Sequence, residues 1–144
     1  MAASLNPWPT TRQGSKDHQV TTLQYLLQAH GHTVTVDGVF GAQTGDAVRA
    51  YQRAKNLPDN GVVGPETWQA LIVEVRPGSE GSAVRGLQRE FRLGEGADGV
   101  YGPVTERAIR TFQQDAQLLV DGVVGPDTWQ ALVSGARSEF SQAA

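Results

Sequence analysis

A segment of twelve residues occurs twice in this chain with only two changes. DGVVGPDTWQAL runs from Asp121 to Leu132, and NGVVGPETWQAL runs from Asn60 to Leu71. Looser copies of its first eight residues are DGVFGAQT, from Asp37 to Thr44, and DGVYGPVT, from Asp98 to Thr105. The motif therefore occurs four times in two pairs, and it predicts two tandem repeats of roughly 60 residues each in a chain of 144.

The rest of the two repeats aligns around this motif. Leu23 matches Leu87 at an offset of 64, and from Asp37 against Asp98 onward the offset is 61, because the second copy is three residues shorter. A short linker with Pro77, Gly78 and Gly81 separates the copies. The predicted organisation is an N-terminal arm, a first repeat, a second repeat and a flexible tail, at residues 1–11, 12–74, 75–134 and 135–144.

Three apolar patterns with helical spacing recur in each repeat. The matching stripes are formed by Val20, Leu23 and Leu27 with Val84, Leu87 and Phe91; by Ala47, Val48 and Tyr51 with Ala108, Ile109 and Phe112; and by Trp68, Leu71 and Ile72 with Trp129, Leu132 and Val133. They predict an all-α fold of two tandem three-helix bundles related by internal duplication. Each half is small and the chain has no cysteine, so we expect the halves to stabilise each other by packing.

Each copy of the motif stands directly before the second or third predicted helix of its repeat. Asp-Gly or Asn-Gly favours a tight turn, because Gly accepts positive φ and the side chain bonds to nearby backbone N–H groups. The next helix then begins with Gly at the N-cap and Pro at the first position, as at Gly125 and Pro126. Asp127 follows in the first turn, where a carboxylate complements the helix dipole. This pattern favours a structural role for most motif residues.

Charge and hydropathy exclude two classes of partner. The net charge is −3 and the basic residues form no run, so the electrostatic footprint of a nucleic-acid binder is missing. No apolar stretch is long enough to span a bilayer. The segment MAASLNPWPTT lacks the charged and apolar regions of a signal peptide, so we expect a soluble chain whose secretion signal, if any, is not visible.

The residues offer little for catalysis. His18, His30 and His32 all lie in the first repeat. His30 and His32 with Asp37 could form a metal cluster, but a zinc site needs three or four ligands in a closed geometry, and the usual metallopeptidase helix signature is absent. GEGADG, residues 94–99, satisfies the G-x-G-x-x-G pattern, but no strand precedes it. The chain has no Gly-x-Ser-x-Gly motif, and without cysteine a thiol nucleophile is impossible. The 15 acidic residues leave a carboxylate pair open. We expect no enzyme activity, no metal and no cofactor.

The repeat resembles the peptidoglycan-binding-like domain family. The resemblance rests on Gly-Ser, then Val-x-x-Leu-Gln, then Asp-Gly-x-[Phe/Tyr]-Gly-x-x-Thr, then an aromatic residue before Gln, then Asp-Gly-x-x-Gly-Pro-x-Thr-Trp, and it covers residues 12–133 twice over. It implies a three-helix module, usually appended to bacterial or phage cell-wall hydrolases. It also implies carbohydrate-type binding to the glycan strands and stem peptides of peptidoglycan without chemistry, and an extracellular or wall-associated location. The zinc-capping cysteine of related metalloproteinase pro-segments has no counterpart here.

A site for such a ligand should be shallow, with polar groups beside an aromatic ring. The turns before the helices and the facing helices offer these groups in both repeats. The candidate ligand-binding residues are Gln24, Asp37, Phe40, Thr44, Gln52, Trp68, Gln88, Asp98, Tyr101, Thr105, Gln113 and Trp129. For each of them the alternative is a purely structural role, and a Trp at the start of an apolar stripe is usually a core residue.

Tyr25 and Leu26 stand where the second repeat has Arg89 and Glu90. They lie outside the buried stripe, so we expect them to be covered, either by the second repeat or the N-terminal arm or by a partner. The apolar Trp8 in that arm, with Leu5, is expected to pack back on the first repeat. A protein-interaction module that docks on a cell-wall hydrolase or another protein is therefore the alternative function, and a small wall hydrolase is a third.

Overall fold

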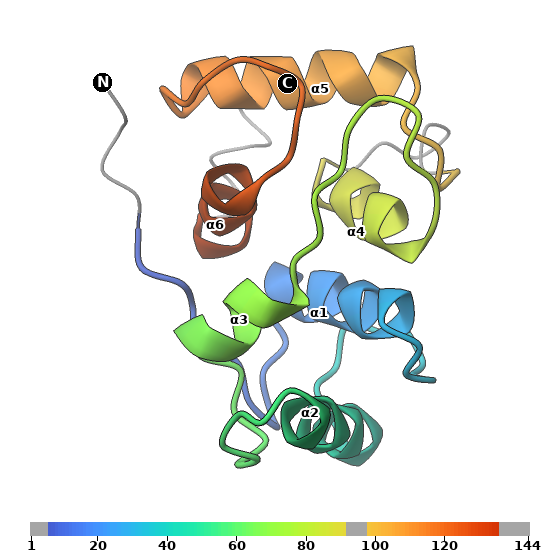
Figure 1. The fold of residues 1–144 in the computed structure, drawn as a ribbon, viewed down its shortest axis with the longest axis vertical. Helices are drawn as coiled ribbons and strands as arrows, with labels where there is room; N and C mark the ends of the chain where they lie inside the picture. The colour runs from blue at the N-terminus through green and yellow to red at the C-terminus, as the bar shows by residue number, and fades with distance from the viewer. Residues whose placement is uncertain (1–5, 92–97, 136–144) are drawn as a thin grey trace.

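The structure is a computed structural model, and it describes residues 6–91 and 98–135. Within these ranges the chain forms six helices and no strand: α1 (His18–Ala29), α2 (Ala42–Ala54), α3 (Pro65–Leu71), α4 (Ser82–Glu90), α5 (Pro103–Asp115) and α6 (Pro126–Ser134). The predicted all-α fold of two tandem three-helix bundles is confirmed (Figure 1). The domain boundaries stay predictions, and Leu5, most of GEGADG and the tail after Gly135 lie outside the described residues.

Both parts of the repeated motif take the expected backbone. The four turn glycines have φ between 73° and 80°, so an L side chain would be strained there. The N-caps of α2, α3, α5 and α6 are glycines in extended conformation, and proline occupies the first position of the last three of these helices. The turn and the helix start are thus fixed by local residues, which explains why the same residue types recur before four of the helices. We call these segments the elbows, at residues 37–41, 60–64, 98–102 and 121–125.

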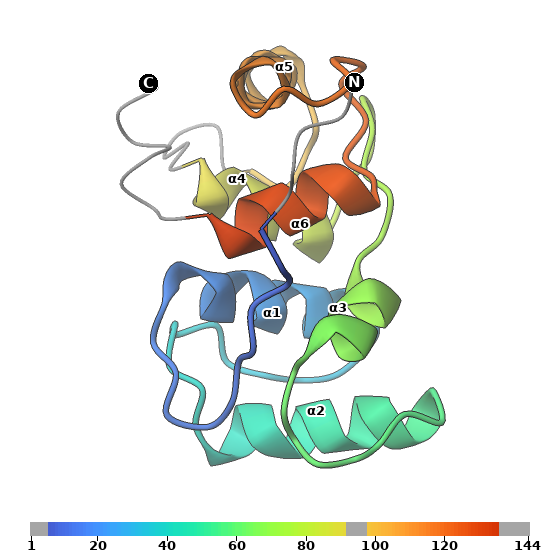
Figure 2. The same ribbon diagram turned by 90° about the vertical axis from the view of Figure 1, so that its left-hand side faces the viewer.

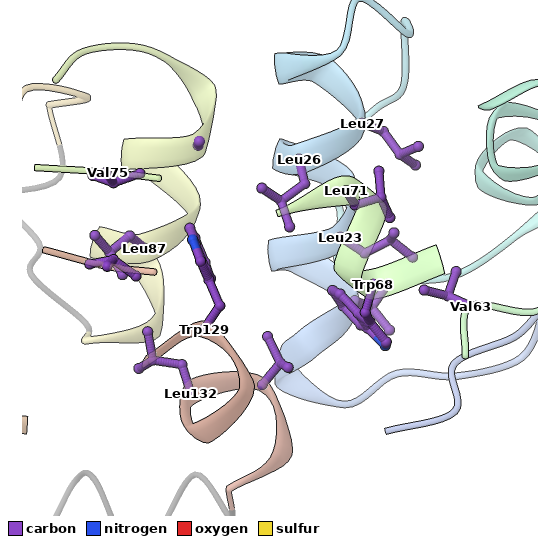
Figure 3. Close-up of a cluster of buried hydrophobic side chains, with 14 of the residues drawn as sticks. Leu23, Leu26, Leu27, Val63, Trp68, Leu71, Val75, Leu87, Trp129 and Leu132 are labelled. Atoms are coloured by element: carbon purple, nitrogen blue, oxygen red, sulfur yellow. The ribbon is translucent and has the colours of Figure 1, made fainter. Parts of the chain in front are cut away.

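The predicted stripes form the core of each repeat. Val20, Leu23 and Leu27 of α1 have no exposed surface, and neither do Trp68 and Trp129. Figure 3 shows each tryptophan beside leucines from the first and third helices of its own repeat. Burial of side chains this large supplies most of the stabilisation available to a small repeat, at about 25 cal/mol per Å² of apolar surface.

The segment before each repeat is part of its fold. Thr11 pairs with Val63 in an antiparallel bridge, and Val75 pairs with Val124 in the same way. The indole Nε1 of Trp68 donates a hydrogen bond to the carbonyl of Pro9 at 2.9 Å. In the same way, Nε1 of Trp129 donates a hydrogen bond to the carbonyl of Val73, which leads into the linker, at 2.7 Å. The arm and the linker therefore have equivalent roles.

The N-terminal arm packs on the first repeat, as expected for Trp8. Its ring stacks on Trp68, with ring centroids 6.3 Å apart and planes 17° apart. The arm also reaches the second repeat, because Nε2 of Gln130 donates to the carbonyl of Asn6 at 2.7 Å. The prediction for Trp8 is thus confirmed.

The two repeats pack through equivalent helices. α1 lies against α4 and also contacts α6, while α2 and α5 lie at opposite ends of the molecule (Figures 1 and 2). Leu26 is fully buried and points toward the second repeat (Figure 3). Tyr25 packs on Gly86, where an added Cβ would lie 3.0 Å from Cβ of Tyr25. Of the coverings expected for this pair, packing on the second repeat is the one observed, with Leu26 fully buried and Tyr25 partly buried.

A buried polar cluster also joins the repeats. Glu90 of α4 is 2% exposed, and its Oε2 accepts a hydrogen bond from the hydroxyl of Thr22 at 2.5 Å. Its Oε1 lies 2.6 Å from Nδ1 of His18, whose Nε2 lies 2.8 Å from the carbonyl of Gly135. The buried carboxylate therefore has hydrogen-bond partners on both oxygens, as a buried charge requires.

Candidate ligand-binding site

The elbow before α2 is held by one buried glutamine of the preceding helix. Nε2 of Gln24 lies 3.0 Å from Oδ1 of Asp37, 3.1 Å from the carbonyl of Val39 and 3.1 Å from Oγ1 of Thr44. Oε1 of Gln24 accepts hydrogen bonds from the backbone N–H groups of Asp37 and Gly38 at 3.1 and 3.0 Å. A single amide thus ties the turn to the helices on both sides of it.

The same arrangement occurs at the other three elbows. In each, the glutamine amide nitrogen approaches an Asp or Asn side chain, a valine carbonyl and a threonine hydroxyl, and its oxygen accepts from the turn glycine. The three sets of glutamine, Asp or Asn, and threonine are Gln52, Asn60 and Thr67; Gln88, Asp98 and Thr105; and Gln113, Asp121 and Thr128. We call each set a glutamine clamp.

The two predicted aspartates of the clamps keep their charge by hydrogen bonding. The N–H of Val39, and then the amide of Gln24, lower the pKa of Asp37 below its ordinary value. The N–H of Val100 is the main cause of the lowered pKa of Asp98. Both side chains are exposed, so their charge is available at the surface while one oxygen holds the turn.

Arginine side chains cover three of the elbows. A Cβ added at Gly61 would lie 3.1 Å from the guanidinium of Arg49, and one added at Gly122 would lie 3.2 Å from that of Arg110. Arg85 takes the same place over Gly99. The sequence signal is an arginine three residues before the clamp glutamine, which the sequence analysis missed. The first elbow has Thr21 at that position instead.

The aromatic candidates belong to the core. Phe40 is 1% exposed and Tyr101 is 3% exposed, and both tryptophans are fully buried. The hydroxyl of Tyr101 donates to the carbonyl of Gly122 at 2.5 Å. Burial is the main cause that raises the pKa of Tyr101 to about 12, and the nearby Glu106 carboxylate adds to it. Among the described residues, none of these rings is placed to stack on a ligand without a rearrangement.

The structure therefore brings the predicted residues together in clamps rather than on an open face. Ten of the twelve candidate side chains are buried, and only Asp37 and Asp98 are exposed. The glutamines, threonines, Phe40 and Tyr101 cluster around the elbows, whereas Trp68 and Trp129 lie in the cores. The contacts observed for the ten are internal, and ligand contact by the predicted residues stays a prediction.

An open groove lies elsewhere, on the second repeat. It has a volume of about 630 Å³ and lies between the end of α5, the last elbow and the first turn of α6. The linker contributes one carboxylate to its rim. The lining residues are Glu74, Gln117, Leu118, Leu119, Asp121, Val123, Gly125, Pro126, Asp127 and Thr128. Sequence reasoning did not find this groove, because it forms only where Glu74 of the linker meets the segment from Gln117 to Thr128.

His30 and His32 pack on the same ring, that of Tyr51, whereas His18 lies at the interface between the repeats. His18 belongs to the interface cluster, and Nε2 of His30 donates to the carbonyl of Leu71 at 2.7 Å. His32 packs its ring edge-on against Tyr51. In the part of the chain that the structure describes, no three His, Cys, Asp or Glu side chains gather at one point, and none of its helices has the length and apolarity needed to cross a membrane.

Two matches to the putative peptidoglycan binding domain cover residues 16–71 and 81–132. The chain belongs to this family. Both matched segments coincide with the two three-helix repeats, and each contains two of the glutamine clamps. The family assignment therefore accounts for the duplicated motif and for most of the chain.

Individual proteins similar to this member of the family include two N-acetylmuramoyl-L-alanine amidases. The N-acetylmuramoyl-L-alanine amidase CwlL of Bacillus licheniformis is 28% identical over a region that covers 81% of this chain and 43% of the amidase. The amidase CwlM of Mycobacterium tuberculosis is 32% identical, over 85% of this chain and 32% of its own length. The chain thus spans less than half the length of these relatives. The Burkholderia AP3 phage endolysin is a similar solved structure, with 26% identity, coverage of 73% and 38%, and a TM-score of 0.44.

Proposed function

We propose that this chain binds bacterial cell-wall peptidoglycan without acting on it chemically, and that it tethers itself or a partner enzyme to the wall. The observation that carries the proposal is the match of both repeats to the putative peptidoglycan binding domain. The proposed location is extracellular or at the cell wall, where this polymer lies. The amidase relatives support an association with wall hydrolases, since they are longer than the region they share with this chain.

The tandem arrangement suits a polymeric ligand. Two modules held in one rigid unit can contact neighbouring epitopes of the same polymer, and such linkage can raise avidity by about 10² to 10⁴ when the geometry permits. The packing of α1 on α4 fixes the two modules relative to each other. Binding of both repeats would therefore depend on the spacing of epitopes along the wall.

Co-sedimentation with purified insoluble peptidoglycan tests the proposal directly. We expect the full chain to leave the supernatant with the wall material and to release no soluble muropeptides. Protein that stays entirely in the supernatant would contradict wall binding. Release of soluble fragments would contradict the non-catalytic part alone, and it would turn attention to the carboxylates of the chain.

A further inference from the structure

The groove on the second repeat has two exposed aliphatic side chains at its edge that the first repeat lacks. Leu119 is 78% exposed and Val120 is 42% exposed, although both are large aliphatic side chains. The equivalent positions of the first repeat, at the offset of 61, hold Pro58 and Asp59. Exposed aliphatic side chains beside a groove carry no benefit for folding, because water surrounds them in the free protein. The difference at these two positions therefore makes the surface beside the groove more apolar in the second repeat than in the first.

The groove combines this apolar wall with negative charge. Leu118, Val123 and Pro126 continue the apolar surface, and the carboxylates of Glu74, Asp121 and Asp127 stand among them. No lysine, arginine or histidine is among the lining residues described. Glu74 forms an ion pair with Arg76 at the surface, and Oδ1 of Asp121 holds the clamp, so a ligand cation has Asp127 and the second oxygen of Asp121 as its candidate partners in the groove.

We propose that this groove binds the diamino-acid side chain of a peptidoglycan stem peptide, with its methylene groups against Leu119 and Val123 and its ammonium group beside Asp121 and Asp127. An aliphatic chain that ends in a cation matches a groove with an apolar wall and an acidic rim. A glycan strand fits less well, because no aromatic ring lines the groove to stack on a sugar face. This inference rests on the proposed function and names the part of the polymer that is recognised.

The first repeat explains why only one such site is expected. Asp59 there forms an ion pair with Arg53 at 2.8 Å, which places a cation near the equivalent surface. The clamp residue Asn60 is neutral where the second repeat has Asp121. A cationic ligand would therefore meet fewer free negative charges and less apolar surface on the first repeat.

The test uses the full chain and a synthetic stem tetrapeptide that carries a free side-chain amine. Titration calorimetry compares this peptide with the same peptide acetylated on that amine and with a chitin oligosaccharide. We expect binding of the free-amine peptide, weakening of about three- to fivefold on acetylation as for a solvent-exposed ion pair, and no binding of the oligosaccharide. The variant Leu119→Pro/Val120→Asp, which copies the first repeat, should weaken peptide binding by a similar factor or more.

The matched control is Pro58→Leu/Asp59→Val, the reverse exchange in the first repeat, which should not weaken peptide binding. Thermal unfolding of both variants checks that the exchanges are tolerated, as expected because each pair already occurs at the equivalent position. Equal binding of the free and the acetylated peptide would overturn the proposal, as would oligosaccharide binding that Leu119→Pro/Val120→Asp reduces. If the chain sediments with peptidoglycan but the titration is flat, the stem-peptide site is wrong and wall binding stands. If the chain fails to sediment, the proposed function is wrong.

Discussion

The two repeats have the same framework and different surfaces. The clamp glutamines, the elbow glycines and the core tryptophans are identical in both, and the glutamines and tryptophans make equivalent side-chain hydrogen bonds to backbone carbonyls in each repeat. The loop before the last elbow differs, with Pro58 and Asp59 in one repeat and Leu119 and Val120 in the other. Comparing the two copies therefore distinguishes residues that hold the fold from residues that are free to serve recognition. Shared positions hold the fold, and the positions that differ on the surface are the better candidates for recognition.

The interface between the repeats follows a similar rule. Equivalent helices pack on each other, yet the residues in contact differ, because Gly86 of α4 takes the place of Thr22 of α1 and Glu90 takes the place of Leu26. Gly86 leaves room for Tyr25, and the carboxylate of Glu90 accepts a hydrogen bond from the hydroxyl of Thr22. The interface is therefore built from equivalent elements that are chemically complementary, and it favours one relative placement of the repeats.

The largest expected effect comes from breaking a clamp. Gln52→Leu or Gln113→Leu removes the acceptor of the glycine N–H and the partners of a valine carbonyl and a threonine hydroxyl, all inside the fold. Each buried group left without a partner costs about 1–3 kcal/mol, so we expect a loss of about 3 kcal/mol or more in the free energy of unfolding. Urea unfolding measures it, and the two variants should lose similar amounts if the clamps are equivalent.

The exposed Gln69 of α3 provides the control, because Gln69→Leu alters no clamp and should change stability by less than about 0.5 kcal/mol. A clamp variant that unfolds like the wild type but no longer sediments with peptidoglycan would reverse the assignment. The glutamine would then contact the ligand, as the sequence suggested, and its internal bonds would be secondary.

A smaller effect is expected from forcing the repeats apart. Gly86→Leu places a side chain where even a Cβ would lie 3.0 Å from Tyr25. Overpacking of this kind costs about 1–3 kcal/mol, partly offset by about 1 kcal/mol because Gly is a poor helix former. We expect a lower thermal midpoint and a broader or split transition, since the repeats would lose part of their mutual support.

A double-mutant cycle separates this from a local effect. Tyr25→Ala with Gly86→Leu should be less destabilised than the two single variants added together, because the smaller side chain makes room for leucine. Strict additivity would contradict a direct contact between α1 and α4 at this point.

Local signals explain which parts of the fold the sequence predicts. The Gly-Pro pairs, the turn glycines and the helical stripes act over a few residues, and they correctly place the helices and their starts. Trp8 and Tyr25 were expected to be covered because apolar side chains of their size are rarely left in water, and both are packed in the structure. These inferences needed no knowledge of how distant segments meet.

The candidate site was harder to predict because its chemistry depends on distant partners. Gln24 is thirteen residues from Asp37 in sequence, so nothing local indicates that its amide is fully satisfied inside the protein. A polar residue on a helix is expected to face water, whereas all four clamp glutamines are at most 1% exposed. The groove has the same difficulty, since Glu74 and Asp127 meet only after the linker has packed on the second repeat.

The smallest expected effect concerns acid stability, where the elbows again differ. The carboxyls of Asp37 and Asp98 have lowered pKa values in the fold, mainly through the backbone N–H groups of Val39 and Val100, while the second elbow uses Asn60. A lowered pKa in the folded state gives stability that is complete above the unfolded value of about 3.9 and is lost as pH falls through the folded pKa. Asp59 adds to the same effect, chiefly through its hydrogen bond from Arg53.

The variant Asp37→Asn should therefore keep the conformation of its elbow, as Asn60 does. As the pH falls below about 4 it should lose less stability than the wild type, because an amide has no proton to take up. Asn60→Asp should do the opposite, since its Oδ1 already accepts the N–H of Val62 at 3.0 Å and a carboxylate there would hold the same turn. Urea midpoints at pH 7 and pH 3 measure both variants. Parallel pH profiles for the two variants and the wild type would mean that the backbone N–H groups do not stabilise these carboxylates. Exchanging Asp and Asn at an elbow would then leave the pH dependence of stability unchanged.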